Sequence, residues 1–253
     1  MLSSEINNYR VFFKKYTGSF FGSNQYKNKN YKLKQDHTKR VCANILELCS
    51  SLNFTEQKKN IAEAIALFHD IGRFVQFKKY NTFSDEKSEN HAILGLRILK
   101  ETKIINKSEY KDIILSAIRF HNLKKLPNTL KDKKTILYSK LIRDADKLDI
   151  FNVLTSYYIS KKTDNPALDL ELPRTTSYAN EVIETFLSNQ CVDSKLLKGD
   201  IDFKILQLSW IYDINFNKTF KIIQHEKYIE KILSVLPKNT DVERIYAHIK
   251  KYL

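Results

Sequence analysis

The sequence predicts an all-α protein, and three observations lead to this fold class. Apolar residues recur at helical spacing along most of the chain, for example at Val41, Ile45 and Leu48. Glycine and proline are scarce, at 5 and 4 of 253 residues, which is too few for the turn-dense pattern of a sandwich or barrel. Helix-favouring lysine, leucine and glutamate are abundant, and no segment alternates like a half-buried strand.

The first part of the chain is expected to hold helices joined by loops. Helical spacing predicts a short helix over 5–16, a loop over 17–35 and a longer helix over 37–51. Thr55 is expected to cap the next helix at its N-terminus, because its hydroxyl can accept from free backbone N–H groups. Gly72 is expected to end that helix.

Further helices are expected beyond a segment without clear periodicity, residues 73–88. The pattern predicts a helix over about 89–101 and another that begins after Ser108 and leads to His121. Residues 134–159 are again helical in pattern.

The last third of the chain is predicted to begin with a connector and to continue as helices. The connector is expected over 160–175, which contains Pro166 and Pro173. Three or so helices follow, and Thr240 with Glu243 has the spacing of a capping box at the start of the last one.

The length favours one or two domains and allows a substantial core. We expect a catalytic core with an N-terminal wrap over residues 1–160. Residues 161–253 are expected to form a helical extension packed on that core, within the same compact domain. Trp210, Tyr212 and Phe216 are expected to fill the core of the extension.

The chain is strongly basic, with a net charge of +14 and a pI near 9.4. A positive surface attracts anions such as phosphate esters, nucleotides or nucleic acid, although a solvated lysine-rich surface gives the same count. Lysines and aromatic rings alternate over 17–35, around Tyr26 and Tyr31. Such rings either stack on bases or wrap the protein core.

Targeting signals and membrane spans are not expected from this sequence. Residues 1–5 have no basic and apolar leader pattern, and no apolar run approaches the roughly 18 residues of a span. The three cysteines, Cys42, Cys49 and Cys191, are sparse and odd in number, which favours a reducing compartment. We therefore expect a cytoplasmic protein.

Histidines and acids form the main chemical signal. Of the six histidines, four lie on or beside predicted helices in the first half, whereas His225 and His248 receive no function. His69 and Asp70 are adjacent and can reach one site from a single turn. Imidazole and carboxylate ligands together suit Mn, Fe, Zn, Ni or Co, and a carboxylate can bridge two cations. Asp70 is therefore the natural bridging ligand.

A second acidic motif interrupts an apolar helical stretch, from Arg143 to Asp149. Buried carboxylates are costly unless they are paired or bind a metal. Alternatively, these acids form a solvated face with Lys147 as counter-ion. A lone histidine is also more often a structural residue than a ligand, so the combination of motifs carries the interpretation.

The order of these residues resembles the HD-domain superfamily of metal-dependent phosphohydrolases. The string from Phe68 to Phe74, FHDIGRF, is similar to that of its HDIG subgroup. Two further histidines, in Asn90-His91-Ala92 and Phe120-His121-Asn122, resemble those of binuclear members. The full pattern H…HD…H…H…D reads His37, His69, Asp70, His91, His121 and Asp146.

The resemblance implies a helical bundle that holds two divalent transition-metal ions, one of Mn, Fe, Ni, Co or Zn. The first ion would be held by His37, His69, Asp70 and Asp146, and the second by Asp70 with the remaining two histidines. Asp144 is the second choice for the ligand position of Asp146. Two residues correspond to about 200° on a helix, so Asp144 would face away from the site if Asp146 faces it.

Other residues near the motifs are candidates for substrate binding and support. Arg73 is the leading candidate to clamp a phosphate, because a guanidinium can grip two oxygens. Lys147 is the next, and Lys124 and Lys125 are weaker candidates. Asp149, one turn from Asp146, could accept a hydrogen bond from a ligand histidine.

The connecting segment, Gln76 to Ser88, is expected to lie at the rim of the site, where it could close on a substrate. A GYP motif and an arginine-rich nucleotide pocket are both absent from the sequence, so two specialised HD activities are not expected.

Three functions fit this pattern. The first is a phosphohydrolase in which Asp70, Arg73 and Lys147 serve hydrolysis of a nucleotide or related phosphate ester by a metal-activated hydroxide. The same ligands also resemble those of HD-fold diiron oxygenases. The third function is a regulatory module that binds a nucleotide or nucleic acid without catalysis.

Overall fold

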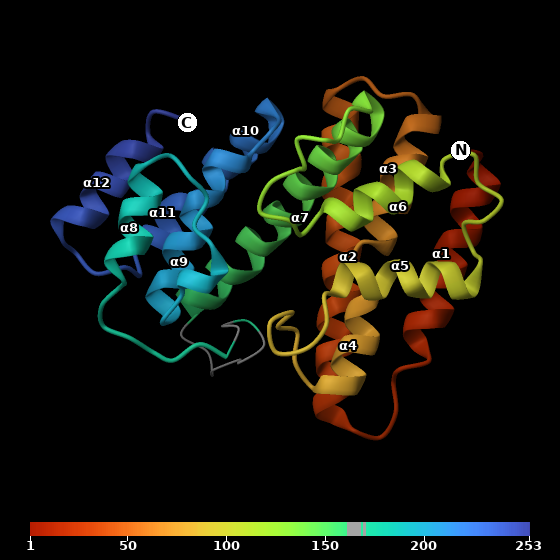
Figure 1. Ribbon diagram of the computed structural model, residues 1–253, viewed down its shortest axis with the longest axis horizontal. Helices are drawn as coiled ribbons and strands as arrows, with labels where there is room; N and C mark the ends of the chain where they lie inside the picture. The colour runs from red at the N-terminus through yellow and green to blue at the C-terminus, as the bar shows by residue number, and fades with distance from the viewer. Residues whose placement is uncertain (161–167, 169–170) are drawn as a thin grey trace. The chain divides into compact units, whose positions relative to one another are not determined.

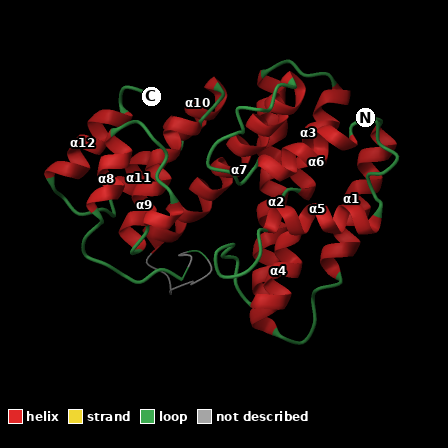
Figure 2. Cartoon of the chain, in the orientation of Figure 1, coloured by secondary structure: helices red, strands yellow, loops and turns green. Residues whose placement is uncertain are grey.

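The computed structural model describes residues 1–160, 168 and 171–253, and it divides them into two compact units, Met1–Asp149 and Ile150–Leu253. The described residues form helices, short 3-10 turns and loops, without a strand (Figure 2). The predicted all-α class is therefore confirmed. Pro166 of the predicted connector lies outside the described residues.

The first unit is built from α1 to α6 and the first part of α7 (Figure 1). Its helices are α1 (Ser3–Gly18), α2 (Gln25–Ser51), α3 (Glu56–Phe68), α4 (Gly72–Tyr80), α5 (His91–Thr102), α6 (Lys111–Phe120) and α7 (Lys133–Ser160).

Helix α3 is the centre of the first unit, since every residue from Asn60 to Phe68 is buried. Alternating alanines and large apolar residues let α1, α2 and α6 all pack on it closely. The end of α3 is thereby fixed in the interior. The motif that follows, His69-Asp70, is buried for the same reason.

The second unit contains the end of α7 and the helices that follow the connector. These are α8 (Asn180–Leu187), η1 (Ser194–Leu196), α9 (Asp200–Ser209), η2 (Trp210–Asp213), α10 (Asn217–His225), α11 (Tyr228–Leu233) and α12 (Thr240–Ile249). Helix α9 is buried along its whole length. The ring of Phe151 packs against Trp210 at 5.5 Å and Tyr228 at 5.8 Å between centroids.

Several predicted boundaries are wrong. The loop predicted over 17–35 is mostly helix, because α2 begins at Gln25 after an Asn24 cap. Tyr31 on this part of α2 packs against Phe74 and Phe77, so its ring covers the core, which is one of the two roles expected for these aromatic residues. Packing of aromatic rings thus stabilises a helix that its polar sequence does not indicate.

Two further differences concern caps. The segment predicted to be irregular over 73–88 begins with α4, and Gly72 is its first residue rather than the end of α3. In α12 the capping side chain is Asn239, which accepts from Val242 N, so the predicted capping box of Thr240 and Glu243 is wrong. Thr55 does precede α3, without a side-chain capping bond.

Candidate metal centre

The six predicted ligand residues converge from five elements of the first unit. We call this set the His/Asp cluster. It comprises His37 on α2, His69 and Asp70 in the turn between α3 and α4, His91 at the start of α5, His121 directly after α6 and Asp146 on α7. The chain between the first and last of these spans 110 positions, so only the fold brings the side chains together.

Close packing at Gly72 sets the position of α5 against the turn. A Cβ at this residue would lie 2.1 Å from the carbonyl oxygen of His91 and 2.7 Å from the backbone nitrogen of Gly95. Only glycine allows this approach of backbone to backbone. Asn90 then starts α5 by accepting hydrogen bonds from Ala92 N and Ile93 N. His91 is therefore held beside Asp70.

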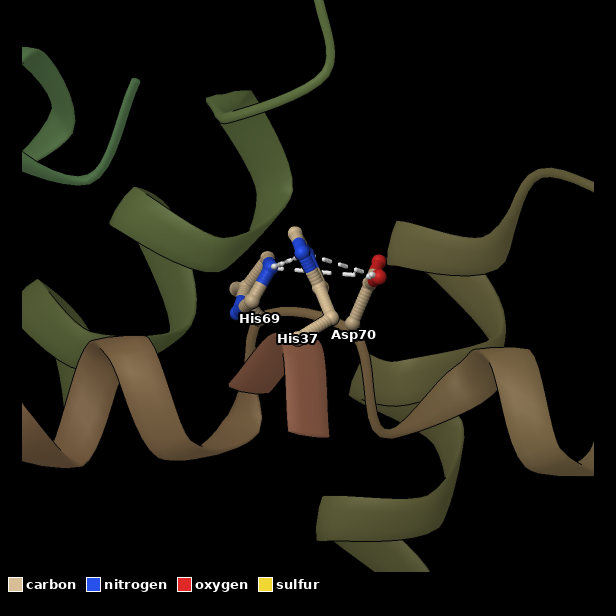
Figure 3. Close-up of side chains that lie close together, drawn as sticks. All are labelled: His37, His69 and Asp70. Atoms are coloured by element: carbon tan, nitrogen blue, oxygen red, sulfur yellow. Dashed lines mark hydrogen bonds and ion pairs between the residues drawn. The ribbon is translucent and has the colours of Figure 1, made fainter. Parts of the chain in front are cut away.

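One half of the cluster surrounds the Oδ2 side of Asp70. The Nε2 atom of His37 lies 3.5 Å from Asp70 Oδ2, 3.2 Å from Asp146 Oδ1 and 3.2 Å from His69 Nε2. The Nε2 atom of His69 lies 3.9 Å from Asp70 Oδ2 and 3.8 Å from Asp146 Oδ1. Figure 3 shows the side chains of His37, His69 and Asp70 pointing toward one another.

The other half faces the second oxygen of the same carboxylate. Asp70 Oδ1 lies 3.3 Å from His91 Nε2 and 4.0 Å from His121 Nε2, and these two nitrogens are 3.0 Å apart. The two oxygens of Asp70 thus face different pairs of histidines. This arrangement is what a ligand that bridges two cations requires.

In each of these four histidines, the Nδ1 atom, which points away from the centre of the cluster, is hydrogen-bonded to an acceptor. Asp149 Oδ2 lies 2.6 Å from His37 Nδ1, and Asp85 Oδ2 lies 2.8 Å from His91 Nδ1. His69 and His121 instead donate from Nδ1 to backbone carbonyl oxygens, each at 2.7 Å. An acceptor at Nδ1 directs the proton to that atom and leaves the Nε2 lone pair free for a metal.

The donor set fits divalent transition metals. Four Nε2 atoms and two carboxylates converge in a largely buried site, with the His37 and His69 nitrogens 3.2 Å apart and the His91 and His121 nitrogens 3.0 Å apart. Burial lowers the pKa of His69 and His91, and it lowers the pKa of His121 to about 3. These three imidazoles are therefore neutral, as ligands must be.

The acids of the cluster are charged for the complementary reason. Burial acts to raise the pKa of Asp70, but the positive charges of Lys34 and Arg73 outweigh it and hold that pKa well below its usual range. For His37, burial and Lys34 lower the pKa, while hydrogen bonds with Asp146 and Asp149 outweigh them and raise it. The carboxylates thus remain available as ligands at neutral pH.

The structure separates the two acids considered for the last ligand position. Asp146 faces the cluster, whereas Asp144 belongs to none of the three candidate ligand groups among the described residues. Asp149 contacts His37, and Arg40 donates to Asp149 from Nε at 2.5 Å and from Nη2 at 3.1 Å. Asp149 therefore occupies the supporting place expected for it.

Arg73 lies at the cluster but is largely engaged by the protein. Its Nε donates to Asp70 Oδ1 at 3.4 Å, and its Nη1 donates to the Gln76 side chain, the Phe83 carbonyl and Asp85. These bonds tie the segment between α4 and α5 to the cluster.

The lysines proposed as substrate contacts lie in two places. Lys147 is buried on α7 next to Asp146, whereas Lys124 and Lys125 are exposed beyond α6.

Two residues at the cluster were not predicted from the sequence. Lys34 donates to Asp70 Oδ2 at 2.9 Å, and its ammonium group lies 5.2 Å from the centre of the Phe83 ring. Asp85 accepts from Arg73, Gln76, His91 and Asn122. The spacing of Lys34 three residues before His37 corresponds to a shared helix face, but this signal requires the helix to begin before residue 37, as it does in the structure.

Comparison with known families agrees with the geometry. Residues 35–150 match the family model of the HD domain, so this part of the chain is an HD domain, as the sequence resemblance predicted. HD domains are generally metal-dependent phosphohydrolases, and the buried His/Asp cluster fits their metal site. Neither the curated proteins nor the solved structures that were compared match the chain.

Among the described residues, the helices are all too short or too polar to cross a lipid bilayer.

Proposed function

We propose that this protein is a metal-dependent phosphohydrolase that acts on a small phosphorylated substrate, with a nucleotide as the expected class. The observation that carries the proposal is the placement of Asp70 between two histidine pairs, one facing each carboxylate oxygen. His37, His69, Asp70 and Asp146 would hold one cation. Asp70, His91 and His121 would hold the other.

Two bound divalent cations would supply Lewis acidity, lowering the pKa of a water molecule and neutralising charge on phosphoryl oxygens. The protein's part is to hold the ligands rigidly. Asp149 and Asp85 fix the orientation of His37 and His91, so the Nε2 atoms need not reorganise when a cation binds.

The substrate phosphate is expected to contact cations of the protein that lie beside the cluster. Lys34 is the best placed, with its side chain 17% exposed and its ammonium group on Asp70. When Asp70 binds cations, this ammonium group is free to meet an anionic oxygen instead. Arg73 and Lys147 add positive charge nearby, and the net charge of +14 favours approach of an anion.

Elemental analysis combined with a nucleotide panel tests the proposal. Protein purified with Mn²⁺, Fe²⁺, Ni²⁺, Co²⁺ or Zn²⁺ should retain about two cations per chain and release phosphate or nucleoside from members of the panel. Turnover should continue without oxygen. Turnover that stops under anaerobic conditions would indicate a diiron oxygenase instead, and a chain that retains no cation would refute the metal site.

A further inference from the structure

A cavity opens on the first unit, outside the His/Asp cluster. Helices α1 and α2 both pack on α3 but make few contacts with each other, which leaves a slot between them. The slot has a volume of about 740 Å³, within the range of small-molecule sites. Its described lining residues include none of the six cluster side chains.

The walls of the slot are mainly apolar and its rim is basic. Phe13 and Leu67 line it and are buried, and Phe21 lines it with an exposed ring. Lys14 and Lys39 line it with exposed side chains, and Lys39 lies 3.6 Å from Asp36. An apolar body with a negative head group complements such a surface.

One residue that lines the slot, Thr38, has a buried hydroxyl without a partner among the described residues. Thr38 is completely buried on α2, and its Oγ1 atom makes no hydrogen bond within the described structure. The neighbouring polar groups are satisfied differently, since Gln35 donates to Thr17 Oγ1 at 2.9 Å, which itself donates to Phe13 O. An unpaired buried hydroxyl is costly, so its presence in a cavity wall points to a ligand acceptor.

The acid in the slot is neutralised. Glu63 accepts two hydrogen bonds from Arg10, each at 2.6 Å. This ion pair leaves the lysines as the charge that an incoming ligand meets. We propose that the slot between α1 and α2 is a binding site for an amphipathic organic anion, with an apolar chain against Phe13 and Leu67 and an acidic head hydrogen-bonded by Thr38.

The test measures binding of decanoate to the full chain by calorimetry, with decyltrimethylammonium as the probe of opposite charge. Decanoate should bind with one-to-one stoichiometry, and the cation at least tenfold more weakly. Gly18→Trp should abolish decanoate binding, because Gly18 lines the slot and a side chain there meets open space. Gly22→Trp is the matched control, since it also meets open space but lies outside the lining.

Two more variants distinguish binding in the slot from binding at the His/Asp cluster. Thr38→Val should keep the fold and weaken decanoate binding roughly five- to tenfold through loss of one hydrogen bond. Asp70→Asn should leave decanoate binding unchanged, so a failure of the proposed hydrolase activity does not affect this result.

The proposal is overturned if decanoate does not bind, if Gly18→Trp binds it like Gly22→Trp, or if Thr38→Val binds it like the wild type. Binding that is lost in Asp70→Asn and kept in Gly18→Trp would place the anion at the cluster and would also overturn it.

Discussion

Asp70 is the central residue of the cluster, because its carboxylate lies between two pairs of histidines. Its Oδ2 faces His37 and His69, and its Oδ1 faces His91 and His121. A carboxamide has the same shape but offers one oxygen and no charge, so it cannot serve both sides.

Asp70→Asn is therefore expected to lower the metal content to less than one cation per chain and to abolish hydrolysis. Helical content, measured by circular dichroism, should change little, because Asp70 lies in a turn between α3 and α4. His69→Ala should behave in the same way. Elemental analysis checks both variants, and full metal loading of Asp70→Asn would contradict its bridging role.

Lys34 is expected to contact the substrate phosphate rather than the metals. Lys34→Gln should raise KM for phosphate substrates about tenfold, the effect of one lost charge-assisted contact, while metal content stays at the wild-type level. Lys32→Gln is the control, because Lys32 lies on the same helix, is exposed and pairs with Asp36. Equal kinetics for both variants would remove Lys34 from the substrate site.

At the scale of elements, the close contact between the start of α4 and the start of α5 shapes the site. Gly72→Ala places a methyl group 2.1 Å from a backbone oxygen, and a backbone cannot move aside cheaply. We expect a loss of at least about 2 kcal/mol in the free energy of unfolding, with weaker metal binding because His91 shifts.

Urea unfolding and metal titration of Gly72→Ala test this expectation. Gly22→Ala is the matched control, since a Cβ at Gly22 meets nothing within 4 Å, and its stability should stay within about 0.5 kcal/mol of the wild type. A Gly72→Ala protein as stable as this control would show that the two helices can separate without consequence.

The elements also show what the sequence could and could not reveal. In α3 and α7, apolar residues recur at helical spacing and predict helices directly. The positions of the histidines in the sequence place them on or beside the predicted helices. The polar start of α2 has the composition of a loop, which hides the position of Lys34 one turn before His37. Asp85 gathers partners from α4, α5 and the segment after α6, at separations of 9, 6 and 37 residues, and these separations follow no helical or strand period.

For the whole molecule, bound cations and the fold are thermodynamically linked. The cluster draws its six side chains from five elements of the first unit, so a cation held there would bind the folded chain much better than the unfolded one. A free Mn²⁺ concentration 100-fold above its Kd should add about 2.7 kcal/mol per site to the free energy of unfolding. Thermal unfolding with Mn²⁺ and after chelation measures this difference, which Asp70→Asn should lack.

The second unit provides a pH-dependent contribution to stability that is independent of metals. Asp200 and Lys204 form a buried pair at 2.7 Å, and Thr175 N also donates to Asp200 at 2.8 Å. Burial acts to raise the pKa of Asp200, but the hydrogen bonds from Lys204 and Thr175 outweigh it and lower that pKa. A carboxyl whose pKa is lowered by folding stabilises the folded state when the pH is above the pKa that the carboxyl has in the unfolded chain, which is about 3.9.

Asp200→Asn should therefore lower the free energy of unfolding by about 3 kcal/mol at pH 7, because it leaves the Lys204 charge buried and unpaired. The difference from the wild type should shrink as the pH falls below about 4, because the unfolded wild type then takes up a proton, and it should be lost once the pH has passed the lower pKa of Asp200 in the folded state. Trp210 is the only tryptophan and lies in this unit, so its fluorescence in urea reports the transition. Glu230→Gln, at an exposed position on α11, should have little effect at either pH. A difference between Asp200→Asn and wild type that does not vary with pH would show that the ion pair is not its cause.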